Sequence, residues 1–398
     1  MFTPARLYLL NRFLSAPLEI LFTLLIFILN KNLDTLPLQI TLMACIKPAS
    51  SLLAFRVSSY IVSNPKKLTP FLVVNALLGA LPCFLIPFID NPWFYVAYYA
   101  LFLTTIRAVN PAWIEYLKRH VDADQLRTTI SRGVSMYYAL GIIVPPLICF
   151  SLDFYPELWR LYFIGFALLQ LLNLKVIFSV TPPESYEALQ KPKLKLKEIA
   201  TLFKKTPGFF PYQLLFFLGG MGIVASQSTL PGYFQDHLHL SYTQLGLAFS
   251  FCKGLTFVLS SPFWTKSAGQ ISIYRINAYL NIFSCLYFGL LIGASLAPNW
   301  IFPAYLFYGV MQAGAQISWN LSGPYFSQEK DSTPYSSINL LFTGIRGCLC
   351  PLLGMIVYGF TGVFSLYVFC GTLCLLGVIY GFWLDHFKVY KSTPSVST

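Results

Sequence analysis

The sequence predicts an all-α membrane protein with twelve transmembrane helices in two pseudo-symmetric six-helix bundles. Of its 398 residues, 56% are hydrophobic and only 11% are charged, whereas an average soluble domain has about 25% charged residues. The mean hydropathy is +0.63. Apolar stretches of about 20 residues, the length that crosses about 30 Å of hydrocarbon, recur twelve times along the chain.

The twelve expected helices follow one another with short polar connections. They span residues 5–29, 37–62, 69–88, 93–117, 129–152, 158–181, 208–232, 242–264, 272–297, 300–323, 336–360 and 363–386. Each is long enough to cross about 30 Å at a rise of about 1.5 Å per residue. The first stretch leads into a multi-span chain and lacks a small-residue cleavage site, so we expect it to stay in the membrane.

The positive charges are distributed unevenly between the connections. If the amino terminus is cytoplasmic, seventeen Lys and Arg residues lie in connections on that side, whereas only Lys31 and Arg160 lie opposite. This positive-inside pattern predicts that both termini are cytoplasmic, with the protein in a bacterial inner (plasma) membrane. The net charge of +12 therefore reports topology, and nothing further in the sequence supports a nucleic-acid partner.

One long polar stretch, residues 181–208, divides the chain. We expect an N-terminal six-helix bundle at 1–181, a cytoplasmic basic linker at 182–207 and a C-terminal six-helix bundle at 208–398. Within the linker, KLKLKEIATLFKK can form a short amphipathic helix on the anionic membrane surface, and a solvated linker is the alternative.

The two halves contain similar segments. Residues 38–53 resemble residues 243–261, so that Gln39 matches Gln244 and Lys47 matches Lys253. The offsets between the matched residues differ by only one position. Duplicated halves are common in transporter folds, and the repeat gives the lysine in the second expected helix a counterpart in the eighth.

These features together resemble the major facilitator superfamily. Residues 107–112 resemble the family's fourth-helix motif, in which an arginine, here Arg107, is followed three residues later by an amide, here Asn110. Pro111 replaces the usual glycine of that motif. The loop SYIVSNPKK at 59–67 keeps the basic end of a family loop but lacks its acidic gating residue, and 261–269 is equally degenerate. The resemblance implies a secondary transporter that works by alternating access as a functional monomer.

Five ionisable residues lie deep inside the expected helices, namely Glu19, Lys47, Arg107, Lys253 and Arg346. Each is about 10 residues from the nearer helix end, or roughly 15 Å, which is close to the bilayer midplane. A charge at that depth costs about 2.5–3.5 kcal/mol on insertion scales. We therefore expect these side chains to face the bundle interior.

Helical spacing surrounds these charges with polar residues. Lys47 shares a face with Ser50 and Ser51, and Lys253 shares one with Ser250 and Thr256. The tenth expected helix contains a polar stripe at steps of three and four residues that includes Gln312, Gln316, Trp319 and Asn320. Such stripes suit a wet cavity or close helix packing.

The balance of these charges predicts the sign of a ligand. Four cations face one anion, Glu19, and a structural interpretation would pair Glu19 with Lys47 in the neighbouring helix. A mobile anionic substrate would relieve the remaining positive charge. We expect Lys47, Lys253 and Arg346 to bind this anion and the stripe to shape selectivity.

Glu19 and Arg107 are the expected coupling residues. Glu19 follows Pro17 in the first expected helix, and a carboxylate that alternates between a cation and a proton can link transport to a proton gradient. A salt bridge that only anchors the helix is the alternative for Glu19.

The sequence thus predicts a secondary transporter of a small anionic solute, with protons or another ion as coupling partner. A drug or metabolite efflux antiporter and a non-transporting membrane sensor of the same fold are the alternatives. No enzyme is expected, because the four histidines lie in connections or at helix ends and form no catalytic group. The nine cysteines have no metal-ligand spacing, so neither a metal nor a cofactor is expected.

Overall fold

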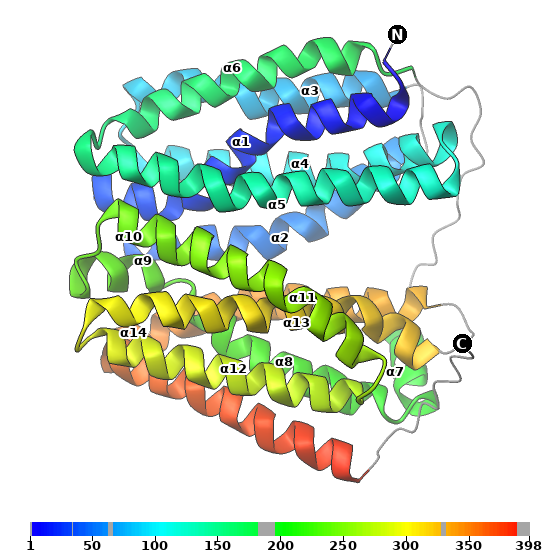
Figure 1. Cartoon of the computed structure of the whole chain (residues 1–398), viewed down its shortest axis with the longest axis vertical. Coiled ribbons are helices and arrows are strands. Elements are labelled where there is room, and N and C mark those ends of the chain that lie inside the picture. The colour runs from blue at the N-terminus through cyan, green and yellow to red at the C-terminus, as the bar shows by residue number, and fades with distance from the viewer. Residues whose placement is uncertain (1, 34, 63–66, 182–195, 328–331, 388–398) are drawn as a thin grey trace. The chain divides into compact units, whose positions relative to one another are not determined.

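The computed structural model describes residues 2–33, 35–62, 67–181, 196–327 and 332–387, which are almost entirely helical and contain no β-strand (Figure 1). This confirms the predicted all-helical class. Eight helices in the described part of the chain are long and apolar enough to cross a membrane. The number of twelve crossings stays a prediction.

The chain divides into two compact units. The first unit comprises Met1–Gln190 together with Ser241–Ser250, and the second comprises Lys191–Leu240 and Phe251–Thr398. The expected boundaries at 181 and 208 stay a prediction, and residues 182–195 of the expected linker lie outside the described residues.

In the first unit, α1 packs against α5 and α6, α2 packs against α4, and α3 contacts α4 and α6 (Figure 1). The 3₁₀ helix η2 continues α3 directly. The elements of this unit are α1 (Pro4–Asn32), α2 (Pro37–Val62), α3 (Leu68–Ala80), η2 (Leu81–Phe88), α4 (Pro92–His120), α5 (Ala123–Phe154), α6 (Leu158–Phe178) and α10 (Tyr242–Gly246).

In the second unit, α14 packs against α8 and α12, and α13 packs against α11 and α12. The π-helical η4 (Leu247–Cys252) connects α10 to this unit. Its elements are α7 (Leu196–Lys205), α8 (Phe209–Ser226), α9 (Leu230–Gly232), η3 (Tyr233–His237), α11 (Lys253–Ala268), α12 (Ile273–Ala294), η5 (Pro298–Trp300), α13 (Ile301–Ser327) and α14 (Thr333–His386).

The longest helix, α14, is interrupted at a glycine. Its 54 residues would measure about 81 Å as one straight helix, far more than the hydrocarbon thickness of about 30 Å. Gly362 has φ 79° and ψ 175°, a backbone conformation that glycine adopts readily because it has no Cβ. The break lies between the two expected helices, 336–360 and 363–386.

Local capping explains where several helices begin. Asn91 accepts a hydrogen bond from the backbone N–H of Trp93 at 3.0 Å at the start of α4. Asp122 accepts one from Gln125 at 2.7 Å at the start of α5. These side chains satisfy backbone donors that have no partner inside the helix.

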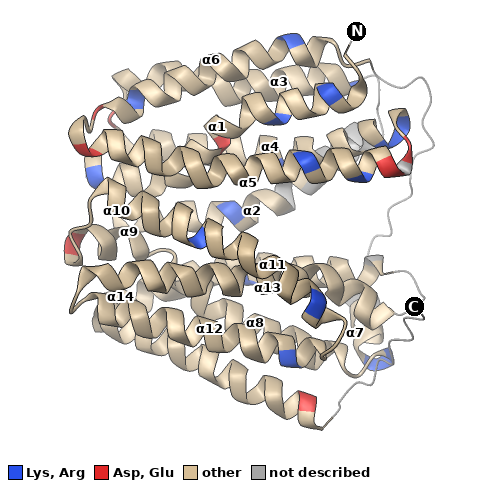
Figure 2. Cartoon of the chain, viewed as in Figure 1, with Lys and Arg blue, Asp and Glu red and all other residues tan. Residues whose placement is uncertain are grey.

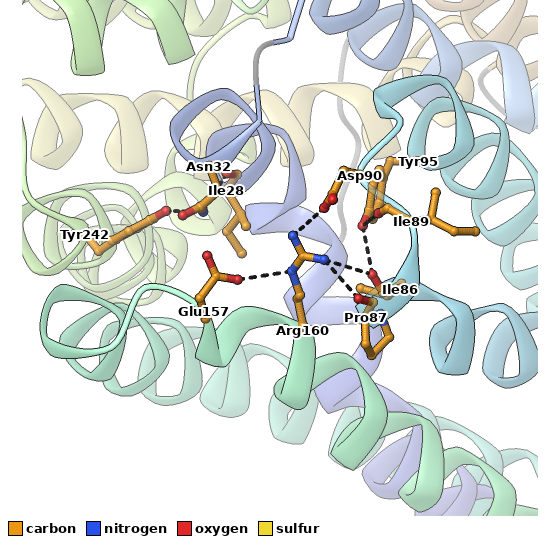
Figure 3. A network of polar contacts seen from close by, with 10 residues as sticks. All are labelled: Ile28, Asn32, Ile86, Pro87, Ile89, Asp90, Tyr95, Glu157, Arg160 and Tyr242. Carbon is orange, nitrogen blue, oxygen red and sulfur yellow. Dashed lines mark hydrogen bonds and ion pairs between the residues drawn. The ribbon is translucent and has the colours of Figure 1, made fainter.

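Arg160 joins the first turn of α6 to the connection between η2 and α4 (Figure 3). Its Nη2 is 2.6 Å from Oδ1 of Asp90, and its Nε is 3.2 Å from Oε2 of Glu157. Its Nη1 also donates to the backbone carbonyls of Ile86 and Pro87. Two carboxylates and two carbonyls therefore neutralise and hold this cation, which indicates a structural role.

Helix α7 has an apolar face that packs on its own unit. Ile199, Leu202 and Phe203 contact the second unit's apolar core, and the Phe203 ring is 5.6 Å from the ring of Phe209. The expected amphipathic helix is thus present at the end of the linker. Its apolar face contacts protein, so this face is not left free for lipid.

Candidate functional site

A cavity of about 170 Å³ lies among α8, α12, α13 and α14 in the second unit. We call it the Arg346 cavity. Most of its lining is apolar, as is usual for small-molecule sites. The polar residues that line it are Asn277, Asn281, Ser284, Tyr308, Gln312 and Arg346.

Arg346 is held in place but not neutralised. Its side chain is 7% exposed, its Nη1 donates to the carbonyl of Phe216 at 2.5 Å, and its Cζ lies 5.1 Å from the centre of the Phe216 ring. In the described part of the chain no carboxylate forms an ion pair with it. A buried cation without an anion costs free energy.

Two adjacent glycines of α8 let the polar side chains approach its backbone. A Cβ built on Gly220 would overlap the guanidinium of Arg346, and one built on Gly219 would overlap the amide oxygen of Asn281. The sequence analysis missed both glycines and the asparagines of α12. The dipeptide Gly219-Gly220 in the middle of an expected helix was the available signal, because glycine there often marks close packing between helices.

The predicted stripe on α13 is only partly in the cavity. All three amide residues are exposed, but only Gln312 lines the cavity. Nε2 of Gln316 lies 3.4 Å from Oδ1 of Asn320. The Trp319 ring is 6.0 Å from the Phe216 ring. The structure therefore places Gln312 and Arg346 in the same cavity lining. Trp319 packs near the Phe216 ring, over which the Arg346 guanidinium lies.

The two matched lysines lie in different units and in different backbone settings. Lys47 precedes Pro48 within α2, and Lys253 begins α11 directly after the π-helical η4. Lys47 is exposed and close enough to Arg107 to interact with it electrostatically, and no described carboxylate pairs with either. Lys253 is not among the residues that line the Arg346 cavity. A shared chamber for the two lysines stays a prediction.

Glu19 forms an ion pair with a residue that the sequence analysis missed. Its Oε1 is 3.3 Å from Nη1 of Arg12, and the two side chains are only 12% and 14% exposed. The guanidinium carbon of Arg12 lies 4.9 Å from the centre of the Tyr137 ring. The salt-bridge interpretation had named Lys47 as the partner. The spacing of seven residues, which places both side chains on one helix face, was the available signal.

The Arg12–Glu19 pair lines a small polar cavity of about 20 Å³, which we call the Glu19 pocket. Asn75, Trp113 and Gln170 also line it. The Oδ1, Nε1 and Oε1 atoms of these three side chains are buried without a hydrogen-bond partner in the described structure. A volume of this size holds about one water molecule, so the pocket is too small for an organic substrate.

No ion pair joins Arg107 to Glu19 among the described residues. Arg107 interacts electrostatically with Tyr99, and Tyr99, Glu19 and Arg12 all interact with Tyr137. The expected coupling residues thus have different electrostatic partners, Tyr99 for Arg107 and Arg12 for Glu19.

The charged residues differ in where they lie along the helices. Figure 2 shows positive residues within several helices, including α2, α5 and α11, whereas negative residues lie mainly at helix ends, apart from one within α1. Among the described residues, no group of three or more His, Cys, Asp or Glu side chains could hold a metal ion.

Comparisons with known proteins agree on a family and a fold. Residues 108–344 match the sequence model of the Major Facilitator Superfamily, whereas no curated protein sequence matches the chain. The nucleoside transporter NupG superposes with a TM-score of 0.70 at 14% identity, over 98% of this chain and 100% of that one.

Two further solved structures are similar. A POT family transporter in complex with 5-aminolevulinic acid gives a TM-score of 0.73 at 11% identity, over 97% of this chain and 96% of that one. A D-xylose-proton symporter gives 0.65 at 14% identity, over 98% and 97%. At these identities the similarity shows the fold alone.

Proposed function

Because the chain belongs to the major facilitator superfamily, we propose that it is a secondary transporter that moves a small anionic solute by alternating access. It is an integral, multi-pass membrane protein. The observation that carries the proposal is the Arg346 cavity, where a buried guanidinium has a backbone carbonyl and an aromatic ring as partners but no described carboxylate.

Electrostatics explains why the ligand is anionic. Removing the partner of a buried charge costs about 3–5 kcal/mol, because the remaining charge is uncompensated. Arg346 is an uncompensated buried charge of this kind in the described structure. An anion that enters the cavity would therefore supply the favourable electrostatic energy that a fixed carboxylate would otherwise provide. A guanidinium also matches a carboxylate or phosphate with two parallel hydrogen bonds.

The other predicted residues have supporting roles in this proposal. Gln312 contacts the solute from α13, and Trp319 keeps the Phe216 ring under Arg346. Lys47, in the first unit, and Lys253, in the second, are proposed as further anion-binding groups, because a positive charge attracts an anion. Gln316 and Asn320 adjust selectivity.

Coupling to protons is assigned to Glu19, with Arg12 as its direct partner and Arg107 as the more distant cation. Protonation of Glu19 would remove the negative partner of Arg12, so the ion pair and the proton compete for one carboxylate. The water-sized Glu19 pocket beside this pair supports the assignment.

The test is equilibrium binding of carboxylates and phosphates to the purified protein, measured by thermal shift and then by calorimetry. Arg346→Gln should weaken binding by about 10- to 150-fold, since a hydrogen bond to a charged group contributes about 1.5–3 kcal/mol. Lys205→Gln is the matched control, because it removes an exposed positive charge of the same unit. Equal binding to wild type and Arg346→Gln would remove Arg346 from the site.

Flux measurements separate the alternatives. In proteoliposomes with an imposed pH gradient, accumulation of the bound anion indicates import, and its expulsion indicates an efflux antiporter. Binding without flux would instead identify a sensor.

A further inference from the structure

One wall of the Arg346 cavity contains three polar side chains of α12. Asn277, Asn281 and Ser284 follow at steps of four and three residues, so they share one helix face. They are 2%, 3% and 3% exposed, and all three line the cavity.

All but one of the hydrogen-bond donors of this wall are already used, the exception being the second N–H of Asn281. Nδ2 of Asn277 donates to the carbonyl of Ile273 at 2.7 Å and to Oγ of Ser318 at 2.8 Å. Nδ2 of Asn281 donates to the carbonyl of Asn277 at 2.9 Å. The hydroxyl of Ser284 donates to the carbonyl of Leu280 at 3.0 Å.

These contacts also decide which way each amide points. A backbone carbonyl can only accept, so the side-chain atom beside it must be the NH₂ group. The amide oxygens of Asn277 and Asn281 accept no hydrogen bond from the described residues. The α12 wall therefore offers mainly acceptors to a ligand, with one N–H of Asn281 as its remaining donor, whereas Arg346, on α14, offers only donors.

Two adjacent glycines of α8 leave room for the acceptor amide of Asn281 and the donor guanidinium of Arg346. The amide oxygen of Asn281 lies against Gly219, and the guanidinium of Arg346 lies against Gly220. Glycine has no Cβ, so neither Gly219 nor Gly220 pushes these two groups away from the α8 backbone. The donor and the acceptor are thus both held against the same turn of α8.

We propose that the Arg346 cavity binds a small zwitterion, a molecule of the amino acid class, with its anionic group on Arg346 and its ammonium N–H groups on the amide oxygens of Asn277 and Asn281. This inference rests on the proposed function and specifies its substrate class. A bound acid that has no amine would displace water from these amide oxygens without donating a hydrogen bond to them. A buried acceptor without a donor costs free energy, so such an acid should bind more weakly. Sites of this kind reject analogues that lack the matching group.

The experiment compares matched ligands on the wild-type protein, so it does not depend on a variant that folds. The panel consists of the twenty common α-amino acids and of ω-amino acids with two to five methylene groups. Each is compared with its deamino acid, its N,N,N-trimethyl derivative, which keeps the positive charge but has no N–H, and its carboxamide. Binding is measured by thermal shift in detergent and confirmed by calorimetry.

We expect at least one amino acid to bind about 10-fold more tightly than its deamino acid and its trimethyl derivative. Equal binding of the deamino acid or of the trimethyl derivative would overturn the zwitterion and leave the anionic solute standing. Equal binding of the carboxamide would instead overturn the proposed function. Failure of every amino acid to bind, at concentrations up to tens of millimolar, would also overturn the inference.

A variant pair gives an independent measurement. Asn281→Leu, which is similar in size but has no acceptor, should lower the affinity for the amino acid toward that of its deamino acid, because only Asn277 then accepts from the ammonium, and should leave the affinity for the deamino acid unchanged. Asn299→Leu, an exposed asparagine of the same unit, should change neither affinity. An unchanged preference for the amino acid in Asn281→Leu would remove Asn281 from the site.

Discussion

The two units differ in whether a buried arginine has a carboxylate partner. In the first unit, Arg12 is 3.3 Å from the carboxylate of Glu19 and lines a cavity of about 20 Å³. In the second, Arg346 has no carboxylate among the described residues and lines a cavity of about 170 Å³. The pair in the first unit is internally balanced and the cation in the second has no described carboxylate, which is why we propose proton coupling in the first unit and solute binding in the second.

A third arginine shows what full compensation looks like. Arg160 interacts with Asp90, Glu157 and two backbone carbonyls at a helix end (Figure 3). The carboxylates around each guanidinium thus underlie the structural role inferred for Arg160, the coupling role proposed for Arg12 and the binding role proposed for Arg346.

The largest expected effect is the loss of the carboxylate in the first unit. Glu19→Leu leaves Arg12 buried without an anion and should destabilise the protein by about 3–5 kcal/mol. The measurement is the apparent unfolding temperature in detergent. Restoration of most of that stability by a second change, Arg12→Met, would show that the pair, and not the glutamate alone, is responsible. An unfolding temperature for Glu19→Leu equal to that of wild type would contradict the balanced pair.

The next effect concerns the glycine beside Arg346. Gly220→Ala places a methyl group where the guanidinium lies, and overpacking of this kind costs about 1–3 kcal/mol. Anion binding should fall together with the unfolding temperature. Gly289→Ala in α12 is the control, because a Cβ there meets no atom within 4 Å. If both variants behave alike, the close approach to Arg346 has no consequence.

A smaller effect of opposite sign is expected at Arg346 itself. Arg346→Met removes a cation that has no described carboxylate and keeps much of the side-chain volume, so stability without ligand should stay equal or rise by about 1 kcal/mol. Thermal unfolding without ligand, beside the Glu19→Leu variant, gives the direct comparison. A marked decrease for Arg346→Met would mean that the protein itself compensates this charge.

The smallest effect is expected on the part of the α13 stripe that does not line the Arg346 cavity. Gln316→Ala removes a side chain that is exposed and hydrogen-bonded only to Asn320 among the described residues. Surface changes of this kind alter stability by about 0.5 kcal/mol or less. Gln312→Ala, in the cavity lining, should instead weaken binding. Equal losses of binding in both variants would show that the whole stripe contacts the solute.

Much of the fold was predictable because hydropathy is a local property. A run of about 20 apolar residues forms a helix in a membrane whatever its neighbours are, since no other open structure satisfies the backbone there. Gly362 likewise separates two expected helices, and its positive φ explains the break in α14. Arg346 and Gln312 were identified because polar residues deep in an apolar run are conspicuous.

The partners of these residues were not predictable from spacing. Arg12 received no role in the sequence analysis, and Glu19 was assigned to Lys47 or Arg107. The acceptor wall of α12 was also missed, because asparagine is only moderately polar. Its importance follows from where each NH₂ group is already bonded.

The sequence by itself determined that this protein is an all-helical membrane protein, that its halves resemble each other, and that cations lie deep in its helices. Those features depend on the composition and order of residues within single segments. Only the tertiary structure decided which cation has a carboxylate, which lines a cavity, and which atoms of an amide remain to accept a hydrogen bond. The free energy of a buried charge or amide depends on atoms a few ångströms away that belong to other helices.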